Sequence, residues 1–181
     1  YLGMTTEKLH FFRNGIDLER FRPEELGDAR RKLGLQEKTT LISVGNLVEL
    51  KGHHIAIEAL QTLPDQTNLI IVGSGPEKAA LEKLANDLQL SNRVHMVGQI
   101  PNDQLRWYMC AANVLVLCSS REGWPNVLLE SMACGTPVIA TNTGGIPELV
   151  SSKLAGQLML ECSAKGLTEA YLKLISEPPD R

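Results

Sequence analysis

Residues 114–134 read VLVLCSSREGWPNVLLESMAC and contain the pattern that decides the fold. The run Val114–Leu117 is apolar without interruption, as expected of a strand that is covered on both faces in a parallel sheet. A polar turn around Gly123 follows, and Asn126–Cys134 then has the spacing of a helix. A strand that leads through a short turn into a helix is half of a βαβ unit, which predicts an open parallel sheet.

The same alternation extends in both directions from this unit. Six further runs are predicted to be strands: Leu9–Arg13, Leu41–Val44, Leu69–Val72, Val94–Val97, Pro137–Ala140 and Gly156–Leu160. Four further segments have helical spacing: Gly52–Leu63, Glu77–Leu88, Asp103–Ala112 and Ala164–Ser176. The polar segment Asp17–Gln36 is predicted to connect the first strand to the main sheet through a loop and an Arg/Leu-rich helix. We therefore predict an α/β fold, a Rossmann-like open parallel sheet with helices on both faces, with residues 1–181 as one domain.

The composition excludes several classes of protein. The chain has 181 residues, of which 43% are hydrophobic and 22% charged, so a folded globular protein is expected. Its net charge is −3 and it has no basic stripe, which argues against nucleic-acid binding. No apolar run approaches the roughly 20 residues that a membrane-spanning helix needs. The four cysteines form no CxxC pair, so we expect reduced, mostly buried thiols and no structural zinc.

The loops at the carboxyl ends of the strands are where such a sheet binds ligands. The first is Gly45–Gly52, which reads GNLVELKG. Its glycines let the backbone approach a ligand, the following helix N-terminus favours an anion, and Lys51 adds a positive charge. The alternative is an ordinary turn with a surface lysine.

Two carboxylates belong to the turn and helix after Val114–Leu117. Glu122 lies in the loop, and Glu130 follows eight residues later within the predicted helix. Such a pair can accept hydrogen bonds from the vicinal hydroxyls of a sugar or ribose, at about 1.5–3 kcal/mol for each charge-assisted bond. Glu130 has apolar neighbours in sequence, where an unused carboxylate would be costly. A binding role is therefore favoured over two solvated charges.

Two more glycine turns have open interpretations. Gly73–Pro76 is similar to the start of a dinucleotide fingerprint, but Lys78 stands where the third glycine would be, and no acidic residue follows Val94–Val97. A tight turn with Pro76 at the first helical position is an equally good interpretation. Thr141–Glu148 contains Gly144 and Gly145 and is either a phosphate cradle or a plain turn.

Together these segments resemble the C-terminal domain of the family 4, or group 1, retaining glycosyltransferases. Arg13–Asp17, with Phe21 and Pro23, is similar to the family's NG(V/I)D…F.P segment, and Gly45–Gly52 to its GRL…KG loop. Glu122 and Glu130 match its E-x7-E signature. Residues 122–150, EGWPNVLLESMACGTPVIATNTGGIPELV, are typical of the family almost residue by residue, and the resemblance covers nearly the whole chain.

The resemblance implies the two-lobed GT-B fold, with the donor mainly on the C-terminal lobe and the acceptor mainly on the N-terminal lobe. It implies that Lys51 binds the donor diphosphate, that Glu122 holds hydroxyls of the transferred sugar and that Glu130 holds the ribose; Lys51 and Glu122 are the catalytic candidates. The implied donor-binding residues are Gly45, Asn46, Lys51, Glu122, Gly123, Trp124, Pro125, Asn126, Val127 and Glu130. The implied base loop is Val97, Gly98, Gln99 and Ile100.

The implied substrate is a UDP- or GDP-linked sugar, used by a cytoplasmic enzyme that is either free or peripheral at the membrane. The resemblance also implies no cofactor and no metal. An N-terminal acceptor domain of roughly 150–200 residues is expected before Tyr1, so the isolated domain should be inactive.

The chain departs from the family's pattern at two positions. The family usually has Arg where this chain has Asn46, and more commonly Phe where it has Trp124. Asn46 keeps open a non-catalytic nucleotide-sugar-binding module. A sugar-nucleotide epimerase of the same fold and an NAD-dependent oxidoreductase also stay open at this point.

Overall fold

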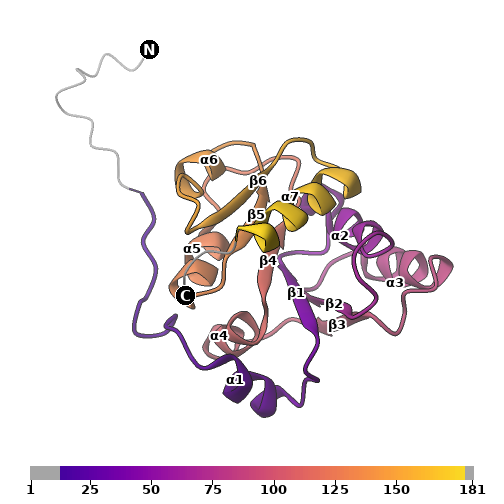
Figure 1. The fold of residues 1–181 in the computed structure, drawn as a ribbon, viewed down its shortest axis with the longest axis horizontal. Coiled ribbons are helices and arrows are strands. Elements are labelled where there is room, and N and C mark those ends of the chain that lie inside the picture. The colour runs from indigo at the N-terminus through magenta and orange to yellow at the C-terminus, as the bar shows by residue number, and fades with distance from the viewer. Residues whose placement is uncertain (1–12, 178–181) are drawn as a thin grey trace.

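The computed structural model describes residues 13–177, which contain a six-stranded sheet (Figure 1). The strands are β1 (Thr39–Val44), β2 (Thr67–Val72), β3 (Val94–Gly98), β4 (Val114–Leu117), β5 (Val138–Thr141) and β6 (Gly156–Met159). Their order is β3-β2-β1-β4-β5-β6, and every neighbouring pair is parallel. The predicted Rossmann-like open parallel sheet is confirmed.

Helices cover both faces of the sheet, as predicted. They are α1 (Leu26–Leu33), α2 (His53–Ala59), α3 (Lys78–Asp87), α4 (Asn102–Ala111), α5 (Asn126–Ala133), α6 (Ile146–Leu149) and α7 (Ala164–Ser176), with a 3₁₀ turn η2 (Glu49–Lys51). Figure 1 shows α2, α3 and α7 on one side and α1, α4 and α5 on the other. Successive residues of β1 divide between the two cores, since Leu41 packs under α2 and α7 and Ile42 under α1 and α4.

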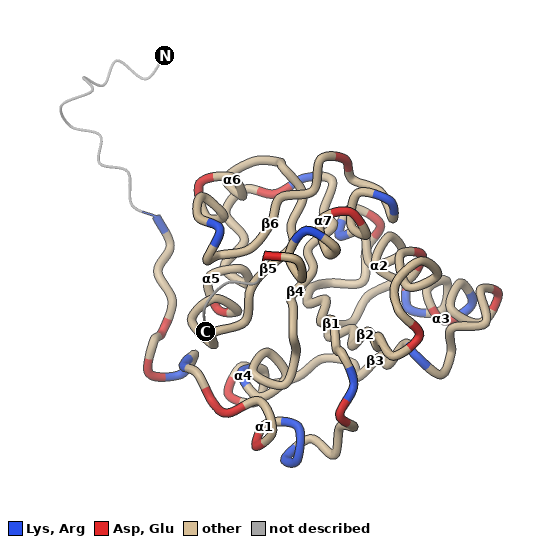
Figure 2. The backbone as a smooth tube through the Cα atoms, in the orientation of Figure 1, with Lys and Arg blue, Asp and Glu red and all other residues tan. Residues whose placement is uncertain are grey.

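The charged residues follow this layering. None of the six strands contains Asp, Glu, Lys or Arg. Figure 2 shows both signs of charge mixed over the helices and loops. Buried strands without charges explain the continuous apolar runs in the sequence, because each strand has an apolar layer on both sides.

Several predicted boundaries change. The predicted strand Leu9–Arg13 lies outside the described residues except for Arg13, which is in no strand. The predicted helix Gly52–Leu63 ends at Ala59, and the next three amides bond to the third residue back, which tightens the chain ahead of Pro64. Pro76 lies in the turn before α3, which begins at Lys78, so Pro76 is not a helical residue.

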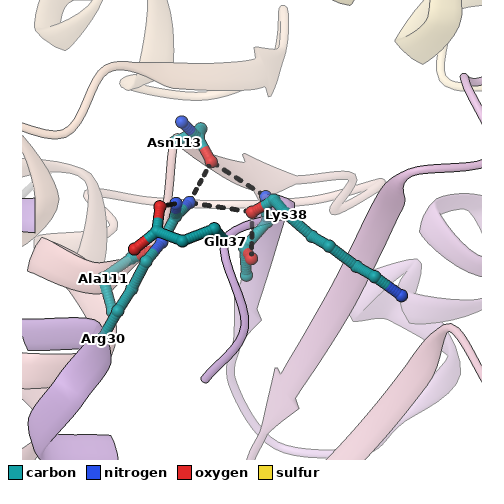
Figure 3. Close-up of polar contacts among 6 residues, drawn as sticks. Arg30, Glu37, Lys38, Ala111 and Asn113 are labelled. Atoms are coloured by element: carbon teal, nitrogen blue, oxygen red, sulfur yellow. Dashed lines mark hydrogen bonds and ion pairs between the residues drawn. The ribbon is translucent and has the colours of Figure 1, made fainter. Parts of the chain in front are cut away.

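Segment 17–36 contains the predicted helix, α1, but Arg30 in it is buried rather than solvated. Its guanidinium donates hydrogen bonds to the carbonyl oxygens of Ala111 and Lys38, at 3.2 and 2.8 Å, and to Oδ1 of Asn113 at 2.8 Å. It also pairs with Glu37 at 3.2 Å (Figure 3). Arg30 thus ties α1 to the chain segments that enter β1 and β4.

The cysteines are divided between the core and the surface. Cys110, Cys118 and Cys134 are buried, and Cys162 is exposed. Within residues 13–177, no helix is long and apolar enough to cross a membrane.

Candidate functional site

The order of the strands reverses between β1 and β4, so the loops after these two strands diverge from the same point of the sheet. A hydrogen bond joins the two loops, from the backbone N–H of Ser120 to the carbonyl oxygen of Leu50 at 2.9 Å. Gly52 ends η2 with a φ of 67°, and a Cβ atom there would overlap the carbonyl oxygen of Cys118. Glycine is therefore required at position 52 both for its backbone angle and for this close approach.

The joined loops bring the two predicted catalytic residues into contact. Nζ of Lys51 donates to Oε1 of Glu122 at 2.6 Å. The Lys51 side chain is 25% exposed and the Glu122 side chain 9% exposed, so the pair is largely shielded from water. An ammonium group has three donors, and Lys51 can therefore keep Glu122 while it donates to a second anion.

The loop after β5 supports the Glu122 loop from behind. The backbone N–H of Gly145 donates to the carbonyl oxygen of Gly123 at 2.9 Å. Gly144 has a φ of 55°, and a Cβ atom on it would overlap the carbonyl oxygen of Glu122. These contacts give the Gly-Gly turn a packing role, because they fix the backbone that carries Glu122.

The Gly73–Pro76 turn supports the first loop in the same way. The N–H of Leu47 donates to the carbonyl oxygen of Ser74 at 2.9 Å, and the N–H of Glu77 donates back to the carbonyl oxygen of Leu47 at 3.0 Å. Leu47 itself is buried in the core. These contacts favour the interpretation of Gly73–Pro76 as a tight packing turn.

The start of α5 presents unused polar groups beside Glu122. Pro125 is the N-cap, and none of the described side chains caps the helix. Within the described part of the chain, Nε1 of Trp124 and Oδ1 of Asn126 are buried and have no hydrogen-bond partner. The guanidinium of Arg13 lies 4.5 Å from the centre of the Trp124 ring and pairs with Glu148 at 2.5 Å. Gly123, Trp124 and Asn126 thus lie at the N-terminus of α5, as the sequence predicted.

Glu130 has different surroundings from Glu122. It is the fifth residue of α5 and half-buried. Burial raises the pKa of its carboxyl group, and the positive charge of Arg20 partly offsets that rise. The two glutamates of the E-x7-E pattern therefore differ. Glu122 forms an ion pair with Lys51, whereas burial disfavours the ionised form of Glu130.

The predicted base loop lies at the edge of the sheet. Val97 and Gly98 end β3, one residue later than the strand was predicted to end, and Gln99 is exposed. The carbonyl oxygen of Gly98 accepts a hydrogen bond from the N–H of Gly73 at 2.8 Å. Ile100 packs against the core beneath α4. The base loop is thus connected to the Lys51 loop through the Gly73–Pro76 turn.

Comparison with known proteins decides the family. The sequence pattern of the family described as "Glycosyl transferases group 1" matches residues 27–181. This chain belongs to that family. The chain corresponds to the C-terminal domain of the group 1 glycosyltransferases, as the sequence predicted.

Several known glycosyltransferases are similar to this chain. The putative teichuronic acid biosynthesis glycosyltransferase TuaC of Bacillus subtilis is 38% identical to it, over 88% of this chain and 39% of the length of TuaC. A GDP-mannose-dependent alpha-(1-6)-phosphatidylinositol monomannoside mannosyltransferase of Mycobacterium tuberculosis is 33% identical, over 92% of this chain and 46% of its own length. The crystal structure of Anabaena Alr3699/HepE in complex with UDP-glucose matches with a TM-score of 0.84 and 27% identity, covering 97% of this chain and 50% of that one. The chain thus spans about half the length of these proteins.

Sequence reasoning missed His53, which lies beside the candidate site. Its Nδ1 lies 2.9 Å from Oγ of Ser43, and its Nε2 lies 3.2 Å from the carbonyl oxygen of Asn46. Burial lowers the pKa of the imidazole, which favours a neutral ring that donates to Asn46 and accepts from Ser43. His53 thus fixes the backbone at Asn46, whose own side chain is exposed. The polar residue at the buried start of a helix, directly after Gly52, was the available signal.

No group of three or more His, Cys, Asp or Glu side chains suited to a metal ion occurs between residues 13 and 177. The positive group that the described site offers next to Glu122 is the ammonium of Lys51. The metal-free mechanism stays a prediction.

Proposed function

We propose that this chain is the donor-binding half of a retaining glycosyltransferase. In this proposal the enzyme transfers a hexose-type sugar from a UDP- or GDP-linked donor to a glycan, lipid or small-molecule acceptor. The observation that carries the proposal is the placement of Lys51, Glu122 and Glu130 around one end of the sheet, each in different surroundings. A nucleotide sugar needs three kinds of recognition, for its phosphates, its sugar and its ribose.

Lys51 supplies the contact with the donor diphosphate. Its ammonium is held by Glu122 and retains two further donors for phosphate oxygens. As the bond between sugar and phosphate breaks, negative charge grows on the diphosphate. A fixed cation and the N-terminal amides of α5 stabilise that charge without a metal or cofactor.

The two glutamates divide the hydroxyl groups of the donor. Glu122 points at Lys51, so it sits beside the proposed diphosphate and next to the sugar that the diphosphate carries. Glu130 lies a turn into α5, in a drier place where its charge is costly in the free protein. Hydrogen bonds from ribose hydroxyls would offset that cost, since they favour the ionised carboxylate.

The choice of nucleotide stays open in this proposal, because relatives with both kinds of donor resemble the chain. The mycobacterial relative is named for GDP-mannose, and the Anabaena protein was crystallised with UDP-glucose. We further propose that the acceptor binds to a second domain, since the chain spans 46% or less of the two curated relatives described above. The isolated domain should therefore bind donor without transferring sugar.

A panel of UDP, GDP and their hexose derivatives, scored by thermal shift on this domain, tests the proposal. We expect one nucleotide series to stabilise the protein, by about 2.7 kcal/mol at a hundredfold excess over its dissociation constant. Lys51→Ala should abolish the shift. Lys78→Ala is the matched control, because Lys78 also follows a strand and its loop but pairs with the exposed carboxylate of Glu82.

Failure of every nucleotide to stabilise the domain would overturn the proposal. Assays on the full-length protein distinguish the transferase from two rival functions. Donor binding without transfer or hydrolysis would indicate a non-catalytic binding module. Epimerised nucleotide sugar in the absence of any acceptor would indicate an epimerase.

A further inference from the structure

A cavity of about 440 Å³ lies at the end of the sheet opposite to Lys51 and Glu122. It is formed by the amino-terminal parts of β1, β2 and β3 and by the loops that lead into β1 and β3. Thr40 is paired with Asn68 across neighbouring strands, and Ile70 is paired with His95, so these four residues face the same side of the sheet. Six residues of β1 separate this end from the Lys51 loop, about 20 Å at 3.3 Å per residue.

Among the described residues, none that lines this cavity is acidic, although the chain has 21 acidic and 18 basic residues. Two other cavities of similar size are lined in part by glutamate, one by Glu58 and Glu169 and one by Glu49. The polar groups here are instead Lys38, His95, Asn68 and Asn92, together with uncharged neighbours. A lining of this kind favours an anionic ligand.

Lys38 is available to such a ligand. Within residues 13–177 no acidic side chain pairs with its ammonium. The adjacent Glu37 is paired with Arg30 at 3.2 Å, and Arg30 also holds the carbonyl oxygen of Lys38 at 2.8 Å. Figure 3 shows Glu37 turned toward Arg30, while the Lys38 side chain extends away from that cluster. The Arg30 cluster therefore fixes the Lys38 backbone and occupies the nearest carboxylate.

Asn68 adds a second requirement. Its Oδ1 atom is buried and has no hydrogen-bond partner in the described part of the chain. Buried acceptors in proteins are nearly always paired, and Asn68 lines the cavity together with Thr40 and Ile70. A ligand that satisfies it must carry a donor, such as a hydroxyl group. The same ligand would need the negative charge that Lys38 attracts.

We propose that this cavity is a second small-molecule site, for a phosphorylated polyol of the sugar-phosphate class. In this proposal Lys38 and His95 bind the phosphate oxygens. Asn68 accepts a hydrogen bond from a hydroxyl group of the ligand, and Ile70 contacts its carbon skeleton. The volume falls in the range of about 300–1,000 Å³ typical of ligand pockets and exceeds what inorganic phosphate fills. The site does not rest on the proposed transferase function, because it lies at the other end of the sheet.

Calorimetry with glucose 1-phosphate, glucose 6-phosphate and glycerol 3-phosphate tests this site. We expect at least one of them to bind, with UDP or GDP present or absent. Lys38→Ala and Lys38→Gln should each weaken it at least tenfold, Asn68→Ala should also weaken it, and Lys51→Ala should leave it unchanged. Thermal melts of each variant control for folding. Glucose and inorganic phosphate should each bind more weakly than the intact probe.

Three results would overturn the proposal. One is that no probe binds the folded wild-type domain at about 10 mM, far above a millimolar dissociation constant. A second is that nucleotide displaces the probe or Lys51→Ala abolishes its binding, which would place it in the donor site. The third is that inorganic phosphate binds as tightly as the sugar phosphates, which would remove the role of Asn68.

Discussion

The ion pair between Lys51 and Glu122 should make a measurable contribution to folding, and a double-mutant cycle isolates it. The variants are Lys51→Met, Glu122→Gln and the double substitution, each of which removes charge with little change in size. Each single variant leaves the other charge without its partner in a shielded position. The double variant removes both charges, so it should be more stable than the sum of the two single changes predicts.

The exposed fractions set the magnitude. Fully exposed pairs contribute about 0.2–1 kcal/mol, and removing one partner of a fully buried pair costs about 3–5 kcal/mol. Lys51 is 25% exposed and Glu122 9% exposed, so we expect a coupling of about 1–3 kcal/mol after allowing for solvent screening of Lys51. For a domain of this size, that corresponds to roughly 2–12 °C in melting temperature.

The matched control is the Lys78–Glu82 pair on α3, which is 3.6 Å apart with side chains 58% and 54% exposed. The same cycle there should give about 0.3–0.5 kcal/mol. Urea unfolding followed by circular dichroism measures both cycles. Equal coupling energies for the two pairs would refute the argument that the joined loops hold Lys51 and Glu122 together.

Three further predictions concern Glu130, Lys51 and metal ions. Glu130→Gln should raise the melting temperature of the unliganded domain at pH 7, because the raised carboxyl pKa means that the ionised form is penalised by burial. Above the raised pKa of Glu130 this penalty is present in full. The gain in melting temperature should therefore shrink as the pH falls through the raised pKa toward the ordinary value of 4.5, and thermal melts recorded across this pH range measure it. Lys51→Ala should weaken nucleoside diphosphate binding in calorimetry far more than it weakens nucleoside binding. The reason is that the Lys51 ammonium would contact the phosphates of the ligand and not its nucleoside. EDTA should leave donor binding and full-length activity intact, as measured by titration and a transfer assay.

Each of these has a contrary result. A Glu130→Gln variant that is less stable than wild type at neutral pH would show that the carboxylate is already compensated. Equal losses for diphosphate and nucleoside would remove Lys51 from the phosphate site. Activity lost in EDTA and restored by manganese would establish a metal requirement.

The sequence was sufficient to predict the sheet and to assign Lys51 and Glu122 to one site at its edge. Continuous apolar strands predict a parallel sheet, and parallel strands place all their following loops at one edge. Two residues that are 71 positions apart can then be assigned to one site from topology and family resemblance alone. Their direct contact at 2.6 Å required the structure, because it depends on the backbone of Gly52 and on the hydrogen bond between Ser120 and Leu50.

Other features were beyond sequence reasoning because their partners come from distant elements. Arg30 looks like a solvated helix residue by composition, yet it is buried against chain segments near positions 38 and 111. His53 has the spacing of a core residue, and only the fold reveals Ser43 and the Asn46 carbonyl on its two nitrogens. Periodicity identifies which face of an element is buried but not which groups it meets there.

The central claim is that Glu122 and Glu130 recognise different parts of one nucleotide sugar. Calorimetry of Glu122→Ala and Glu130→Ala, each titrated with the nucleoside diphosphate and with its sugar derivative, tests it most directly. Glu130→Ala should weaken both ligands alike, by about 1.5–3 kcal/mol for one lost charge-assisted bond. Glu122→Ala should weaken only the nucleotide sugar, leaving the diphosphate unchanged or tighter because Lys51 loses its partner. Equal losses of both ligands in Glu122→Ala, or no loss in either variant, would contradict the account.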